Sequence, residues 1–139
     1  MRRVLLLSVS AAVFAVAMSA QDAAEYKTWM QTAGATAGSL HKNLDAKNAE
    51  AAAADAKKLQ EIFSHVHEYW MKKDVADAMK FAMNASEGFG IVAADASASK
   101  FDEASATLKT TSANCGGCHT VHREKLPEGG LTDRFTLLQ

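Results

Sequence analysis

The feature that most constrains the fold is the helical spacing of apolar residues along every long stretch of the chain after residue 20. In the first such stretch, apolar or small residues recur three or four positions apart, which places them on one stripe of a helix. These residues are Tyr26, Met30, Ala33, Ala37, Leu40 and Leu44. No stretch shows the strict alternation that is typical of a β-strand. The sequence therefore predicts an all-α fold.

Three further segments repeat this helical pattern. The second carries Ala52, Ala56, Leu59, Phe63, Val66 and Trp70, the third carries Val75, Met79, Ala82, Phe89 and Val92, and the fourth carries Phe101, Ala104, Leu108, Cys115 and Cys118. We expect turns near Asp45, Asp74 and residues 96–99, with Asp74 as the cap at the start of the third helix. Four such helices can hide their apolar stripes only against each other, which predicts an antiparallel four-helix bundle over residues 21–125.

The first twenty residues have the pattern of a secretory signal peptide. Arg2 and Arg3 precede an apolar stretch over residues 4–18, and small residues follow at Ser19 and Ala20. The apolar stretch is shorter than the ~20 residues that span a bilayer. We therefore predict cleavage after Ala20, with residues 15–17 as a competing site and an uncleaved anchor helix as the alternative. The mature protein is expected to be periplasmic or otherwise exported, without stable membrane insertion.

Composition limits the number of domains and the kinds of partner. The chain has 139 residues, one proline, no Gly/Ser-rich linker and a formal net charge of −1, so one domain is enough. No basic stripe with interleaved aromatic residues is present, which argues against a nucleic-acid partner. A tail at residues 126–139 follows the last helix, and Pro127, Gly129 and Gly130 prevent further helix there.

The strongest chemical signal is the run Cys115-Gly116-Gly117-Cys118-His119, which matches the attachment pattern of a c-type haem. Two thiols three positions apart can each add to one vinyl group of a haem, and the imidazole that follows can bind the iron. The two glycines are expected to leave room for the porphyrin edge and to let the backbone bend around it. The sequence predicts one covalent haem c, held by Cys115 and Cys118, with His119 as the proximal iron ligand.

Two cysteines three positions apart have three other possible roles. A disulfide across two residues of a helix would constrain little chain. A redox-active dithiol normally follows a strand, and none precedes Cys115. A zinc site lacks the second pair of cysteines. The dithiol oxidoreductase without haem is kept as one alternative function.

With these motifs in place, the mature chain resembles the class II c-type cytochromes, the cytochrome c′ family and its low-spin relatives. The likeness rests on the four amphipathic segments, on Met-Gln-Thr at residues 30–32, and on the attachment motif in the last segment. The resemblance implies that the haem hangs on the last helix, that Met30 lies over its distal face, and that Arg123 lies near the proximal imidazole. His122 departs from the family, which usually has an aromatic residue there.

The resemblance also implies a function. We expect an electron carrier rather than an enzyme, passing single electrons between a redox-protein donor and acceptor. A five-coordinate protein that binds a diatomic gas such as NO or CO is the alternative. Antiparallel dimers are common in the family, so a homodimer is also expected as an option, with Gly34 and Gly38 on its face.

The sixth iron ligand separates these functions. Met30 is a soft thioether on the inward stripe, so it is either the distal ligand or a core side chain. Met79 and Met83 are expected to be core packing. Lys27 and Arg123 are candidates to pair with the haem propionates.

Two glycines, a histidine and two tryptophans have expected positions in the bundle. Gly34 and Gly38 weaken a helix, which suggests close approach of a neighbouring helix or of a flat ligand. His122 is expected either to bond a propionate or tune the proximal imidazole, or to be solvated at the helix end. Trp29 and Trp70 are expected in the core or in a haem wall.

Overall fold

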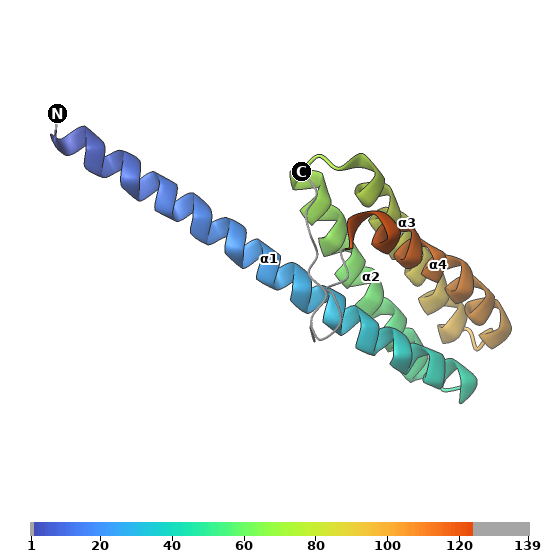
Figure 1. The fold of residues 1–139 in the computed structure, drawn as a ribbon. Coiled ribbons are helices and arrows are strands. Elements are labelled where there is room, and N and C mark those ends of the chain that lie inside the picture. Colours follow the sequence, from blue (N-terminus) through green and yellow to red (C-terminus); the bar gives the residue numbers. More distant parts are fainter. Residues whose placement is uncertain (1, 124–139) are drawn as a thin grey trace, which may run out of the picture.

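In the computed structural model, the described residues form a bundle of four α-helices joined by short turns (Figure 1). The helices are α1 (Arg2–Asp45), α2 (Ala49–Lys72), α3 (Ala76–Ser97) and α4 (Phe101–His122). The structure describes the backbone of residues 2–123 and the side chains of residues 21–123. The side chains of the predicted signal peptide and the predicted tail at residues 126–139 lie outside the described residues. The prediction of an all-α, four-helix chain is confirmed.

The apolar stripes of the four helices meet in one core. The largest side chains that are fully buried come from all four helices, and they are Trp70, Phe89, Leu40, Leu59, Leu108 and Val92. Along the bundle α1 packs mainly on α2, α2 on α3, and α3 on α4. The contact between α1 and α4 is much smaller, so the seam between these two helices is the loosest in the bundle.

The three turns share one construction. Each has a single non-glycine residue with positive φ, at Lys47 (53°), Asp74 (55°) and Ser99 (60°). In each turn the next residue donates its backbone N–H to a carbonyl five positions back, as Val75 does to Trp70 at 3.3 Å. This is the Schellman closure of a helix C-terminus. Asp74 is the positive-φ residue that closes the end of α2. The prediction that Asp74 is the N-cap of α3 is therefore wrong, and Val75 is the N-cap residue.

The glycines that allow helices to pack closely are not the ones expected. A Cβ built on Gly34 or Gly38 meets nothing within 4 Å, so close approach of a neighbouring helix does not explain them. A Cβ on Gly117 would instead lie 2.7 Å from the Phe81 ring. A Cβ on Gly88 would lie 2.7 Å from Cγ2 of Thr111. A Cβ on Gly90 would lie 2.7 Å from Nε2 of Gln60. The tight glycine contacts are therefore those of α3 with α4 and with α2, and none involves α1.

We expect Gly88→Ala to destabilise the protein by about 1–3 kcal/mol, the usual cost of overpacking a close-packed site. The facing Thr111 is 3% exposed, and its hydroxyl donates to the Thr107 carbonyl at 2.8 Å, so it has little freedom to move. Gly38→Ala is the matched control, and it should stabilise α1 by about 1 kcal/mol because Ala is the better helix former. Urea unfolding of both variants measures the two effects, and equal effects would contradict the packing role of Gly88.

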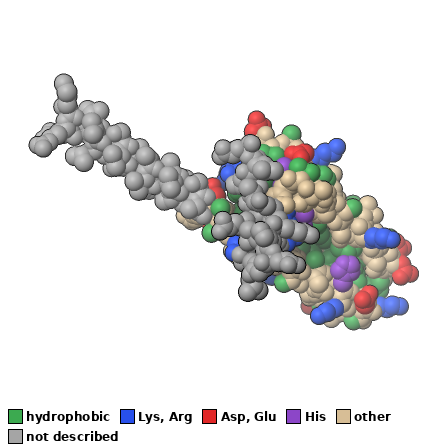
Figure 2. All heavy atoms as spheres, viewed as in Figure 1, with side chains coloured by type: hydrophobic (Ala, Val, Ile, Leu, Met, Phe, Trp, Pro, Cys, Tyr) green, Lys and Arg blue, Asp and Glu red, His purple; other side chains and the backbone are tan. Residues whose placement is uncertain are grey.

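The surface of the bundle carries charges of both signs. On the face shown in Figure 2, Lys and Arg side chains lie interspersed with Asp and Glu over the described residues. Within the part of the chain that the structure describes, no helix has an apolar run long enough to cross a bilayer.

Candidate functional site

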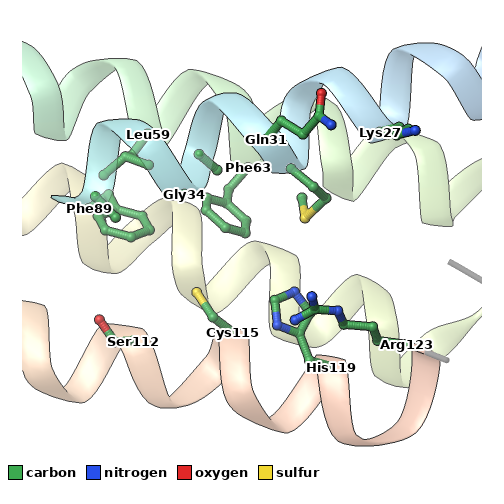
Figure 3. Close-up of a pocket in the computed structure, with 13 residues that line it drawn as sticks. Lys27, Gln31, Gly34, Leu59, Phe63, Phe89, Ser112, Cys115, His119 and Arg123 are labelled. Atoms are coloured by element: carbon green, nitrogen blue, oxygen red, sulfur yellow. The ribbon is translucent and has the colours of Figure 1, made fainter. Parts of the chain in front are cut away.

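A cavity of about 490 Å³ lies at the loose seam between α1 and α4, with side chains of α2 and α3 behind it. Figure 3 shows most of its lining. The lining residues are Lys27, Met30, Gln31, Ala33, Gly34, Ala37, Leu59, Phe63, Phe89, Ser112, Cys115, His119 and Arg123. Its volume is in the range of ligand pockets, which run from about 300 to 1,000 Å³.

One wall of the cavity is a single face of α4. Ser112, Cys115 and His119 are three or four positions apart, the spacing that aligns side chains along a helix, and Arg123 adds to this wall from just beyond the helix end. In Figure 3 the Cys115 sulfur and the His119 ring both point from α4 towards α1. The guanidinium of Arg123 lies beside the imidazole. The helix thus presents a thiol, an imidazole and a cation to the same space.

The opposite wall is a face of α1 built mainly from small residues. Met30 and Gly34 are one turn apart on it, and Ala33 and Ala37 complete its apolar surface. Met30 is half-buried and packs against the core. The open space beside Gly34 is therefore part of the cavity. This supports the hypothesis that Gly34 leaves room for a ligand, and not the hypothesis that it lets a neighbouring helix pack closely.

The two ends of the cavity differ in polarity. Leu59, Phe63 and Phe89 form an apolar end, and the rings of the two phenylalanines stack with centroids 5.4 Å apart. Lys27 and Arg123 lie at the other end, as Figure 3 shows. The cavity can therefore take a molecule that is apolar over most of its length and anionic at one edge.

Burial controls the ionisation of the reactive groups. Burial lowers the pKa of His119, and the nearby charge of Arg123 lowers it further, which favours the neutral imidazole that binds metals. Burial raises the pKa of the Cys115 thiol. Burial also raises the pKa of Cys118 to about 11, with smaller contributions from Asp77 and Cys115. Both cysteines are free thiols in this structure.

Cys118 does not line the cavity, unlike Cys115. It is partly buried, close enough to Tyr26 for their charges to interact. The intervening glycines also differ from the expectation, because α4 continues unbroken to His122 and Gly117 faces Phe81. The backbone bend predicted at these glycines is absent from the described part of α4.

The prediction that His122 is solvated at the helix end is wrong, because His122 is only 8% exposed. It does not line the cavity. Its Nε2 lies 3.0 Å from Oδ2 of Asp77, and its ring centroid lies 5.1 Å from that of Trp70. Trp70 is buried in the core, as expected. Met83 is 44% exposed, so its predicted core position is wrong, whereas Met79 packs against the core.

The structure thus brings five of the six predicted site residues into one cavity: Lys27, Met30, Cys115, His119 and Arg123. The sixth, Cys118, lies outside the lining. Sequence reasoning missed Gln31 and Ser112 as lining residues. Gln31 is one helical turn from Lys27, and Ser112 is one turn from Cys115, so their spacing could have predicted that they share the same helix faces.

No protein-family model, curated protein or solved structure was found to match this chain. Among residues 21–123, no group of three or more His, Cys, Asp or Glu side chains is placed to hold a metal ion by itself.

Proposed function

We propose that the chain is an exported monohaem c-type cytochrome of the class II kind, which carries single electrons between redox proteins. The observation that supports this most is the cavity at the seam of α1 and α4. Its α4 wall carries Cys115 and His119 of the attachment motif, and Met30 lies on the α1 wall. A c-type haem needs such a set of groups around one space.

The cavity fits the haem group in three respects. The apolar end at Leu59, Phe63 and Phe89 suits the porphyrin ring, and the space beside Gly34 leaves room for it. Lys27 and Arg123 would pair with the propionates at the opposite end. When bound, the haem supplies a reversible one-electron couple at its iron. Since Cys118 lies outside the lining, bonding to both thiols requires its side chain to turn towards the cavity.

The protein's own groups would tune and shield this couple. His119 would bind the iron through its imidazole, which partial burial keeps neutral by lowering its pKa. Met30 would complete the coordination, and a thioether in this position raises the reduction potential relative to a second histidine. The apolar lining lowers the local dielectric, which also affects the potential.

The state of the thiols weighs against the dithiol oxidoreductase. Reactive cysteines of that class have a lowered pKa and sit at a helix N-terminus. Here burial raises the pKa of both thiols, and both lie within the second half of α4.

We expect the full chain, produced together with a haem-attachment system and exported, to be red and to gain the mass of one haem. The haem should stay with the polypeptide through acid-acetone extraction, because thioether bonds survive it. A variant with both Cys115→Ala and Cys118→Ala is the control, and it should lose its colour on extraction. Colourless wild-type protein with two titratable thiols and no added mass would overturn the proposal.

A further inference from the structure

The contact between Asp77 and His122 joins the start of α3 to the end of α4. The two side chains are 45 positions apart in sequence, and their Oδ2 and Nε2 atoms lie 3.0 Å apart. The imidazole also packs against Trp70 of α2, whose Nε1 donates to the Tyr26 hydroxyl on α1 at 3.2 Å. A connected set of contacts therefore reaches from His122 to all the other helices.

Asp77 is held in place for this contact. It lies in the first turn of α3, where a negative charge is favoured by the helix dipole. Its Oδ1 accepts a hydrogen bond from the backbone N–H of Ala78 at 2.9 Å, which leaves Oδ2 for His122. The hydrogen bond from His122 is also the main reason that the pKa of Asp77 is lowered. The acceptor is thus ionised at neutral pH, and such hydrogen bonds are stronger than neutral ones.

The last turn of α4 would be weakly held without this contact. The helix ends at His122, and Arg123 is already extended, with its N–H bonded to the His119 carbonyl at 3.2 Å. Helix ends fray, and Gly116 and Gly117 weaken the preceding turn. Yet this last turn carries both His119 and Arg123 into the cavity. Its position therefore decides where the imidazole lies.

We propose that Asp77 and His122 are positioning residues: their hydrogen bond, supported by Trp70, fixes the last turn of α4 and thereby sets where His119 faces the cavity. That the hydrogen bond holds the last turn of α4 is a statement about the polypeptide alone. That it positions the ligand of a haem iron rests on the proposed function.

The first test uses the full chain without haem, and it compares hydrogen exchange in Asp77→Ala, Asp77→Asn and wild type. In Asp77→Ala the amides of Val121, His122 and Arg123 should exchange about tenfold faster, because the tether is lost and the turn opens more often. Asp77→Asn keeps an acceptor oxygen and should restore most of the protection. The amide of Leu108, in the middle of α4, should be unchanged. Equal acceleration along the whole helix, or none, would overturn the proposal.

The control is Asp102→Ala, which removes an exposed acid from the first turn of α4. It loses a similar helix-dipole interaction but no contact with His122, so exchange in the last turn should stay as in wild type. Faster exchange there in this variant would mean that loss of charge, and not loss of the tether, is responsible, and the proposal would fail.

The second test uses haem-loaded protein. Asp77→Ala should shift the reduction potential and broaden or split the spectral bands of the haem, because the imidazole is no longer held in one position, and Asp77→Asn should stay close to wild type. A potential and spectrum identical in all three proteins would overturn the positioning role. If wild type binds no haem, the proposed function fails, and the exchange experiment still decides whether the last turn is tethered.

Discussion

Replacing Gly34 by leucine is expected to reduce the haem bound per chain by about tenfold or more. Gly34 lines the cavity, and a Cβ built on it meets nothing within 4 Å, so the larger side chain would extend into the space assigned to the porphyrin. Overpacking of this kind costs about 1–3 kcal/mol, and each 1.4 kcal/mol changes an equilibrium by about tenfold. Absorbance of extracted, washed protein per mole of polypeptide measures the effect.

Gly38→Leu is the matched control for this prediction. Gly38 is one turn further along α1, exposed, and absent from the cavity lining. Both variants replace glycine by a better helix former, so both should be at least as stable as wild type without haem. If only Gly34→Leu loses haem, the cause is the filled cavity and not a folding defect. Equal haem content in the two variants would show that the cavity is not the haem site.

The second large effect is expected for Met30→Ala. If the thioether binds the iron, its removal changes a low-spin spectrum to a high-spin one and abolishes the weak sulfur-to-iron charge-transfer band of the oxidised protein. The affinity for CO should rise by about tenfold or more, because the gas no longer has to displace a protein ligand. Absorption spectra and CO titration of the reduced protein measure both changes.

Met83→Ala is the control, because Met83 is an exposed methionine of α3 that does not line the cavity. Its spectrum and CO affinity should match those of wild type. If Met30→Ala also matches wild type, Met30 is not a ligand. High-spin wild-type protein that already binds CO would favour the gas-binding function.

The fold could be predicted from the sequence because helical spacing directly records which face of each helix is buried. Tyr26, Leu40 and Leu44 were placed on the inward stripe of the first helix, and all three are buried. The turn at Asp74 was less predictable. A cap residue and a residue that closes the preceding helix have similar sequence preferences, and only the exact end of α2 separates them.

The candidate site could be predicted where its residues lie on one helix face. Cys115 and His119 are four positions apart, so a helix alone brings them together, and Arg123 follows directly after the helix end. Contacts between residues of different helices could not be predicted from the spacing along one helix. Nothing in the spacing pairs His122 with Asp77, 45 positions away. Spacing also does not distinguish Gly117, which faces Phe81, from Gly34, which faces open space.

The uneven contacts of α1 have a consequence for how a large rigid group would enter. Because α1 packs mainly on α2 and hardly on α4, it can move away from α4 without breaking the contacts among α2, α3 and α4. Moving it away would uncover Cys115 and His119 while α2, α3 and α4 stay assembled. Although α1 is made first by the ribosome, this favours a maturation order for the proposed cytochrome in which α1 docks last, after the haem has been joined to α4.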